Sequence, residues 1–184
     1  KYKNEMKKYG KSGNKEKYAF FHKRQLVQKI LLNSLYGVLG LPAFRFYDID
    51  NAEAVTTTGQ TVIKSTADMA NIKYNKELGD PELDSNIYID TDSVFFSAAP
   101  LLDKRIPSWR DNNQDTIAQY VNDIAEEMQD YLNDFYDILS EKIFNVDKDK
   151  HRLEIKKEYV AKAGLWIAKK RYAQWIISDN GVPV

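Results

Sequence analysis

Hydrophobic and polar positions along the chain follow two periods, which predict both helices and strands. Residues 114–143 carry apolar side chains near helical spacing, which is typical of an amphipathic helix packed on one face. Two further helices are predicted over residues 18–37 and 52–77, the second with Asn51 as its N-cap. The predicted strands span residues 87–90, 94–97, 152–164 and 165–178. We therefore expect an α+β fold in which an antiparallel sheet is backed by helices.

The segments between these elements have the composition of turns and loops. Residues 1–16 are rich in lysine and hold two glycines, which predicts an exposed turn or mobile linker. Residues 43–49 alternate aromatic and polar side chains and are predicted to be extended. Residues 98–112 hold two prolines, which predicts a loop. A final turn is predicted at Asp179-Asn180-Gly181.

The charges of the chain are segregated, although the formal net charge of its 184 residues is zero. Residues 1–30 hold ten Lys and Arg against two acidic residues, and residues 148–172 hold nine against three. Residues 80–147, between these basic blocks, hold sixteen acidic residues against four basic ones. This arrangement suits a polyanion gripped at two places with a cation site between them. Solvated helix faces beside an acidic surface would give the same pattern.

The absence of cysteine excludes disulfides and thiolate metal sites and favours an intracellular protein. No apolar run approaches the roughly 20 residues that a membrane span needs, so we expect no membrane partner. No cationic leader followed by an apolar segment opens the sequence, and we expect no export.

Two carboxylates interrupt the predicted hairpin "NIYIDTDSVFFS", residues 86–97, at Asp90-Thr91-Asp92. Burying an isolated ionised carboxylate is costly, so we expect a bound cation to compensate the charge. Strand alternation places Asp90 and Asp92 on one side, where their oxygens suit a hard divalent ion such as Mg²⁺. An Asx-type turn in a surface hairpin would explain the same residues without a metal.

The stretch "KILLNSLYG" gives the 18–37 helix a polar face. Lys29, Asn33, Tyr36 and Gly37 follow one another at i, i+4, i+7 and i+8 and therefore share one side of the helix. A cation, an amide and a phenol beside a glycine can hold a phosphate and press against a base pair, because glycine permits close approach. A surface lysine and a helix-ending glycine would also account for the pattern.

Three motifs occur in a fixed order: K-x-x-x-N-S-x-Y-G at Lys29–Gly37, Y-x-D-T-D-S at Tyr88–Ser93 and K-K-R-Y at Lys169–Tyr172. Together they resemble the motifs of family B DNA polymerases. The intervening "RFYDIDNAEAVTTTGQ" is similar to the T-even phage branch of that family. The resemblance covers most of residues 18–178. It implies that residues 1–40 end a fingers domain and that residues 41–184 form the carboxyl-terminal part of a palm domain, whose sheet carries the metal-binding hairpin.

The resemblance implies nucleotide and DNA contacts for two of the motifs. In the first motif, Lys29 is expected to bind the triphosphate of a dNTP with Asn33 close to it. Tyr36 and Gly37 are expected to line the nascent base pair. The last motif is expected to hold the primer-terminal duplex through Lys169, Lys170, Arg171 and Tyr172. A basic surface edge strand is the alternative for that segment.

For the acidic hairpin, the resemblance implies a two-metal Mg²⁺ site in which Asp92 is a ligand and Asp90 has a supporting, structural role. Glu158 matches an acidic residue near the metal in the T-even branch, so we expect it near the site. Thr56–Gln60 resembles a segment near the template strand, although a threonine-rich helix turn explains it equally well. His22 and His151 have no partners spaced for catalysis and are expected to be ordinary surface or helix residues.

One part of the family pattern is missing. The second metal-binding aspartate belongs to D-x-x-S-L-Y-P-S, which lies upstream of the fingers motif and does not occur in these 184 residues. With the thumb also expected beyond residue 184, we expect a partial chain from a truncated gene or a split polymerase. Alone it is predicted to be inactive, to bind DNA weakly and to self-associate through an apolar sheet face. The expected partners are primer–template DNA, dNTP and an upstream polymerase half, in the cytoplasm of a phage-infected host.

Two other functions stay open at this point. A non-enzymatic DNA-binding palm remnant, or scaffold, would keep the basic segments, although intact Asp92 and Lys29 argue against lost catalysis. A reverse transcriptase or nucleotide cyclase would share two-metal chemistry. Neither of those enzymes is expected to carry "KILLNSLYG" and "KKRY" around the acidic hairpin.

Overall fold

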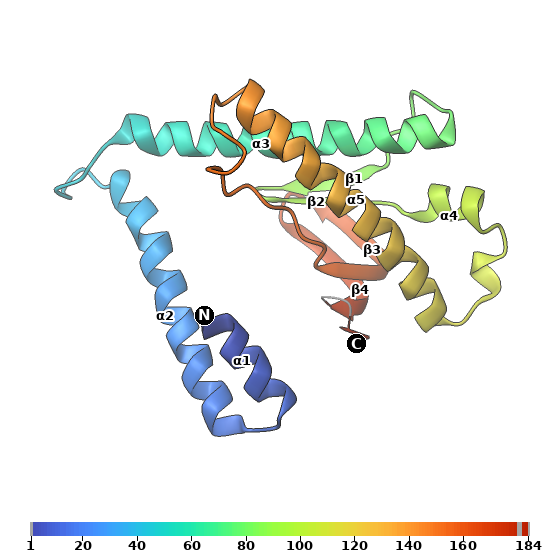
Figure 1. Cartoon of the computed structure of the whole chain (residues 1–184), viewed down its shortest axis with the longest axis horizontal. Helices are drawn as coiled ribbons and strands as arrows, with labels where there is room; N and C mark the ends of the chain where they lie inside the picture. The colour runs from blue at the N-terminus through green and yellow to red at the C-terminus, as the bar shows by residue number, and fades with distance from the viewer. Residues whose placement is uncertain (1, 180–181, 184) are drawn as a thin grey trace. The chain divides into compact units, whose positions relative to one another are not determined.

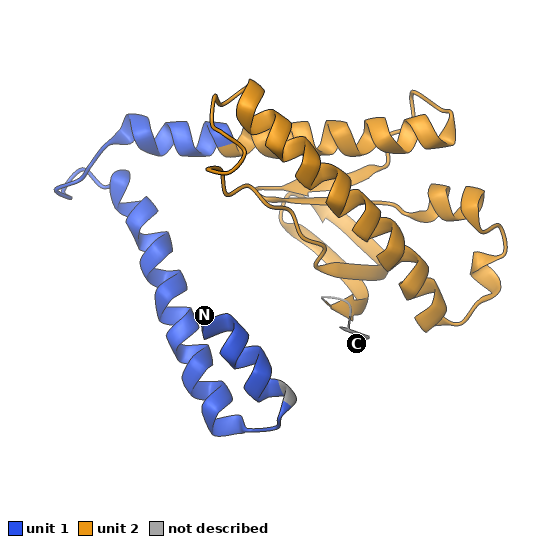
Figure 2. Cartoon of the chain, viewed as in Figure 1, with its two compact units in different colours: residues 1–58 blue, residues 59–184 orange. Residues whose placement is uncertain are grey.

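The computed structural model describes residues 2–179 and 182–183 and confirms the α+β class (Figure 1). The chain divides into two compact units, Lys1–Thr58 and Gly59–Val184, which Figure 2 shows in different colours. The helices are α1 (Tyr2–Lys11), α2 (Lys15–Leu39), α3 (Ile49–Leu78), α4 (Ala99–Arg105), α5 (Gln114–Lys142) and a 3₁₀ turn η1 (Trp109–Asp111). The strands are β1 (Asn86–Asp90), β2 (Ser93–Phe96), β3 (Tyr159–Ala168), β4 (Arg171–Asp179) and β5 (Val182–Pro183). In the described part of the chain, no helix is both long and apolar enough to cross a membrane.

The first unit begins with a helical hairpin where a linker was predicted. Residues 2–11 form α1, because its aromatic side chains contact α2: the Tyr9 ring stacks on Phe21 with centroids 5.5 Å apart. Gly13 turns the chain with a φ of 71°, and the Asn14 side chain caps α2 by accepting a hydrogen bond from the Lys17 N–H. The abundance of lysine obscured these aromatic contacts in the sequence.

The connection from α2 to α3 is a series of turns, and the prediction of an extended segment there was wrong. Phe44 donates its N–H to the Leu41 carbonyl and Tyr47 donates to the Phe44 carbonyl, which coils the aromatic segment. The Asp48 carboxylate accepts the Asn51 N–H at 3.0 Å. Asp48 therefore caps the helix that was predicted to begin after Asn51.

The second unit has its core between three helices and the acidic hairpin. The core is formed by Ala70, Tyr74, Leu101, Leu102, Ile124, Met128 and Leu132, which are all buried. The Phe96 ring of β2 packs edge-on against Tyr74, with centroids 5.6 Å apart. The segment predicted as a loop contains α4, because Pro100 starts the helix and two leucines behind it enter the core.

The carboxyl-terminal sheet turns later than predicted. β3 and β4 are joined by Lys169-Lys170, whereas the sequence predicted a division after Gly164. Gly164 lies inside β3, and a Cβ at this position would collide with the Trp166 indole, which lies over it. The absence of a side chain at Gly164 thus leaves room for the Trp166 ring on the same face of β3. Asn180 and Gly181, of the last predicted turn, lie outside the described residues; β5 pairs antiparallel with β4.

The strand predicted over 152–164 is regular only from Tyr159. The preceding residues alternate between exposed and half-buried positions, but their partners are side chains of α5. The Asn133 amide bonds both the N–H and the carbonyl of Ile155, at 2.9 and 3.1 Å, and Gln129 accepts the Lys157 N–H at 3.0 Å. The alternation of exposed and half-buried residues therefore results from packing against the helix α5, and not from pairing in a sheet.

His151 also packs against α5. The prediction that it is an ordinary surface or helix residue was wrong. Its side chain is only 12% exposed, and Nε2 lies 2.8 Å from the Asp137 carboxylate of α5. Nδ1 accepts the Leu153 N–H at 3.2 Å, which leaves Nε2 as the donor to Asp137. His22 is exposed on α2, as predicted.

An arginine joins the three core helices and gives a testable pH dependence. Arg105 of α4 donates to Glu77 of α3 at 2.6 Å and to Glu127 of α5 at 2.8 Å. The Arg105 hydrogen bonds are the main cause that lowers the pKa of each carboxyl, and partial burial opposes them. Because both pKa values are lower in the folded chain, the stabilisation is present above the ordinary glutamate value of about 4.3 and is lost as the pH falls through the lowered values.

We expect Arg105→Met to reduce this pH dependence. Urea unfolding followed by circular dichroism at pH 7 and pH 3 should show a smaller loss of stability on acidification in the variant than in the wild type. The other carboxylates act in both proteins and cancel in the comparison. Equal losses in the two proteins would contradict the expectation.

Candidate functional site

The acidic hairpin ends in a strained tip. Asp90 pairs with Ser93 in the β1–β2 register, which leaves Thr91 and Asp92 to turn the chain. The Asp92 N–H donates to the Asp90 carbonyl at 2.6 Å, and Thr91 has a φ of 53°. A positive φ is unusual for a β-branched residue, and such strain is found most often at functional sites.

The expected burial of the two carboxylates is wrong for Asp92. Asp92 is an exposed residue at the tip. In the preceding strand β1, Ile87 and Ile89 are also exposed, at 47% and 39%. The Asp90 side chain is sheltered, at 17% exposed, and its charge is compensated by Lys170, whose Nζ lies 3.2 Å away. A lysine of the chain itself thus balances charge at Asp90, in a place where the sequence led us to expect only a metal ion.

The Asp90 carboxylate also accepts a hydrogen bond from the Thr91 hydroxyl at 3.0 Å. That hydrogen bond is the main cause that holds the pKa of Asp90 below its ordinary value; partial burial opposes it, and Lys170 adds to the lowering. Asp90 is therefore held as an anion by two partners. Thr91 was not predicted as a site residue, although its place between the two aspartates was visible in the sequence.

The basic motif forms a turn beside this hairpin. Lys169 and Lys170 are the two turn residues and were wrongly expected on a strand; Arg171 and Tyr172 begin β4. Lys170 has a φ of 61°, and its N–H donates to the Tyr88 hydroxyl, 82 residues away, at 2.8 Å. The structure thus brings the acidic and basic motifs together.

An aromatic cluster fixes the two hairpins to each other. It consists of Tyr88 and Phe95 from the acidic hairpin and Trp166 and Tyr172 from the basic one. The Tyr172 centroid lies 5.5 Å from Tyr88, 5.7 Å from Phe95 and 6.4 Å from Trp166. Tyr88, Phe95 and Trp166 were not predicted to support the site. Tyr88 opens the Y-x-D-T-D-S motif, but nothing local marks Phe95 or Trp166, since their contacts join segments that are distant in sequence.

The residues of α2 that were predicted to bind a nucleotide are exposed. Lys29, Asn33, Tyr36 and Gly37 are all exposed residues of this helix, and the Tyr36 hydroxyl donates weakly to the Ala52 carbonyl at 3.4 Å. Among the described atoms, a Cβ on Gly37 would meet nothing within 4 Å. The chain's own packing therefore does not require glycine there, although glycine costs about 1 kcal/mol in a helix relative to alanine.

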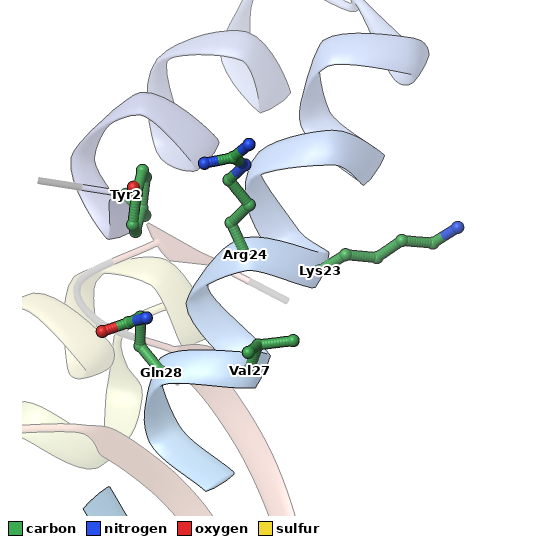
Figure 3. Close-up of a pocket in the computed structure, with 5 residues that line it drawn as sticks. All are labelled: Tyr2, Lys23, Arg24, Val27 and Gln28. Carbon is green, nitrogen blue, oxygen red and sulfur yellow. The ribbon is translucent and has the colours of Figure 1, made fainter. Parts of the chain in front are cut away.

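The first unit also has a shallow groove, which involves the preceding part of α2 and the start of α1. It is lined by Tyr2, Lys23, Arg24, Val27 and Gln28 (Figure 3). The Arg24 guanidinium lies over the Tyr2 ring at 5.9 Å, while Lys23 points away from the others. Because none of the predicted site residues lines the groove, it is not a candidate active site.

The described residues do not form a complete metal centre. Across residues 2–179 and 182–183, no group of three His, Cys, Asp or Glu side chains is placed to hold an ion. Glu158 is an exposed residue just before β3. Asp92 offers an exposed carboxylate, a ligand type that Mg²⁺ prefers, so the residues fit a site whose other ligands come from elsewhere. Thr56, of the segment compared with a template contact, donates its hydroxyl to the Glu53 carbonyl of its own helix at 2.8 Å.

Comparison with known proteins decides the family. The sequence model of the family described as DNA polymerase family B matches residues 1–182. The chain belongs to DNA polymerase family B. The assignment made from the three motifs is thereby confirmed, and a reverse transcriptase or nucleotide cyclase is no longer an alternative.

The family B relatives include two phage enzymes. The DNA-directed DNA polymerase of Enterobacteria phage T4 is 33% identical over 158 residues, which are 81% of this chain and 17% of that protein. The DNA-directed DNA polymerase of Escherichia phage RB69 is 32% identical over 168 residues, again 81% of this chain and 17% of that protein. The DNA polymerase of Thermococcus gorgonarius is 30% identical over 150 residues, 82% of this chain and 15% of that protein. The chain thus spans about a sixth of the length of these relatives. Their names as DNA polymerases do not favour the alternative of a non-enzymatic DNA-binding scaffold.

Proposed function

We propose that this chain is part of a template-directed DNA polymerase, which transfers a nucleotide from a dNTP to the 3′-hydroxyl of a primer. The observation that carries the proposal is the contact between the two hairpins. A strained tip with an exposed carboxylate, Asp92, lies beside a turn of two lysines, and Lys170 joins them. Family membership supplies the reaction class, because the relatives are named as DNA polymerases.

Within this proposal, residues 1–40 are the end of the fingers and residues 41–184 are the carboxyl-terminal part of the palm. Lys29 neutralises the triphosphate and Asn33 donates to it, since an ammonium and an amide are good phosphate ligands on one helix face. Tyr36 and Gly37 present a flat surface to the nascent base pair, where the missing side chain of Gly37 leaves room.

Asp92 is proposed as a ligand for Mg²⁺, and Glu158 as an acidic residue near the same site. Asp92 and an aspartate from another segment would hold two Mg²⁺ ions, whose charge would lower the pKa of the primer hydroxyl and neutralise the leaving pyrophosphate. The γ-type turn at Thr91 holds the Asp92 carboxylate at the hairpin tip. Asp90 is engaged with Thr91 and Lys170 and supports the tip.

The basic turn is proposed to grip the primer–template duplex. Lys169, Lys170 and Arg171 contact phosphates, and the long lysine side chains reach into the groove. Such contacts are indifferent to base sequence, which suits an enzyme that accepts every template. Tyr172 is held by the aromatic cluster and steadies the strand that carries Arg171.

The proposed polymerase is completed by other segments, among them an upstream half with the motif D-x-x-S-L-Y-P-S. The chain alone offers no complete metal centre among its described residues and is proposed to be inactive. Its exposed apolar side chains are available to partners or to a second copy: Leu165, Ile167 and Trp175 of the basic hairpin are 61%, 75% and 61% exposed.

Mg²⁺-dependent primer extension tests the proposal. The chain is mixed with separately expressed segments that precede and follow the matched region in the phage T4 relative, and a labelled primer is followed on a gel. Extension that needs this chain together with the added segments would support the proposal. Extension by the chain alone would contradict its proposed incompleteness. No extension from folded, DNA-binding proteins would support a DNA-binding scaffold.

Gly37→Ala is expected to act in opposite directions on stability and on activity. Alanine should stabilise α2 by up to about 1 kcal/mol, because the position is helical and open. In the reconstituted extension assay the added methyl group should raise the KM for dNTP, since it occupies the space proposed for the base pair. Thermal unfolding by circular dichroism and steady-state extension measure the two effects. Gly59→Ala, at an equally open glycine of α3, is the matched control for the stability effect alone, because Thr56–Gln60 was compared with a template contact. A Gly37→Ala variant that is more stable and fully active would contradict the role of this glycine.

A further inference from the structure

Lys170 is held by the acidic hairpin through two separate contacts. Its Nζ lies 3.2 Å from the Asp90 carboxylate, and its backbone N–H donates to the Tyr88 hydroxyl at 2.8 Å. The two contacts use the side chain and the main chain of one residue. They therefore fix both the position of the turn and the direction of the ammonium group.

The backbone of Lys170 needs such support. Its φ of 61° is a left-handed conformation, which is unfavourable for a residue with a Cβ. Two-residue hairpin turns usually place glycine or asparagine at such positions. A lysine in this conformation is maintained by its neighbours, and the neighbours here are Tyr88 and Asp90.

The two members of the ion pair differ in their access to solvent. The Asp90 side chain is 17% exposed and is also bonded to Thr91, so it stays in place as an anion. The Lys170 side chain is 63% exposed, so its ammonium can be approached by another anion. Asp90 is the fixed partner, and Lys170 is the partner that can exchange.

We propose that Asp90 is a positioning residue for the basic turn, which holds Lys170 in the free protein and competes with a nucleic-acid phosphate for the same ammonium group. The inference rests on the proposed function, since it concerns the DNA grip of that site. It assigns to Asp90 a role toward DNA that is separate from metal binding. The acidic hairpin thereby limits the strength of the primer contact, so that DNA is held less tightly than the lysines alone would hold it.

The competition can be measured without metal. Binding of a fluorescein-labelled primer–template to the full chain is followed by anisotropy in EDTA over a series of KCl concentrations. Asp90→Asn should raise the DNA affinity about two- to fivefold, the range of an exposed ion pair. It should also steepen the dependence of log K on log salt by about one, because one more lysine becomes available to a phosphate.

A double-mutant cycle isolates the pair. In the Lys170→Gln background, Asp90→Asn should change DNA affinity much less than in the wild type, because the competing cation is gone. In the Lys169→Gln background, which makes the same charge change in the same turn, the effect of Asp90→Asn should persist. Asp92→Asn, which removes a charge from the same hairpin, should not be coupled to Lys170. An effect of Asp90→Asn that is equal in all three backgrounds would overturn the proposal.

A second comparison does not depend on the folding of an Asp90 variant. Lys170→Gln should cost less DNA affinity than Lys169→Gln, because Asp90 already neutralises part of the Lys170 charge in the free protein. The reverse order would overturn the proposal. If the wild-type chain binds no DNA, the proposed DNA grip fails, and the competition fails with it. A urea-unfolding cycle on Asp90 and Lys170 then decides whether Asp90 holds the turn, because zero coupling would overturn that part as well.

Discussion

Asp92→Asn is expected to slow Mg²⁺-dependent primer extension by the reconstituted polymerase roughly 10²–10³-fold, as when one charge-stabilising group is removed from a reaction centre. The substitution keeps the size of the side chain and removes one anionic oxygen ligand. Mg²⁺ binds carboxylates in preference to amides, so the site should lose both affinity and charge balance. The Asp92 residue is exposed at the hairpin tip, so folding should not change.

Two matched variants make this result specific. Asp134→Asn makes the same change at an exposed position of α5 and should extend primers at the wild-type rate. Asp90→Asn changes the other carboxylate of the tip, which is engaged with Thr91 and Lys170, and should lose less activity than Asp92→Asn. Circular dichroism establishes that each variant is folded. Comparable losses at Asp90 and Asp92 would mean that both carboxylates act on the metal, and normal extension by Asp92→Asn would remove this residue from the reaction.

The elements that sequence predicted best are those with a local signal. α5 begins at Gln114 because Asn113 accepts the Thr116 N–H, and its apolar face follows the period that predicted it. The acidic hairpin was predicted from strands over residues 87–90 and 94–97 around a charged tip, and its strands β1 and β2 lie within one residue of those bounds. In both cases, the residues that determine the element lie within it, so short-range chemistry is sufficient.

The errors have one physical origin, which is a partner that lies far away in sequence. Residues before Tyr159 alternate like a strand but bond to Asn133 and Gln129 of a helix. Gly164 resembles a strand break, but it lies mid-strand beneath an indole ring. Neither pattern identifies its partner, and the same pattern fits two structures.

The candidate site divides in the same way. The motifs supplied the residues that carry charge, including Lys29 and Asp92, because those residue types are visible in the sequence. They did not show that Lys170 would pair with Asp90 and bond to Tyr88, since that pairing depends on how two hairpins dock. The exposure of Asp92 was also missed, because apolar neighbours suggested burial although Ile87 and Ile89 are themselves exposed.

Lys29→Met is expected to raise the KM for dNTP roughly 10- to 100-fold in the reconstituted enzyme. This is the effect expected when one hydrogen bond to a charged group is lost. Methionine keeps an unbranched side chain and good helix propensity, so α2 should remain folded. Since the triphosphate is bound before and during the reaction, the change should fall mainly on KM, with kcat less affected.

Lys23→Met is the matched control for this prediction. Lys23 is an exposed lysine of the same helix. It precedes Lys29 by six positions, which places it about 120° away around the helix axis. Figure 3 shows it directed away from its neighbours. If the proposed face binds the triphosphate, Lys23→Met should leave the KM unchanged. An equal rise in KM for both variants would show that the general positive charge of the helix attracts the nucleotide. Lys29, Asn33, Tyr36 and Gly37 would then have no specific role as a binding face.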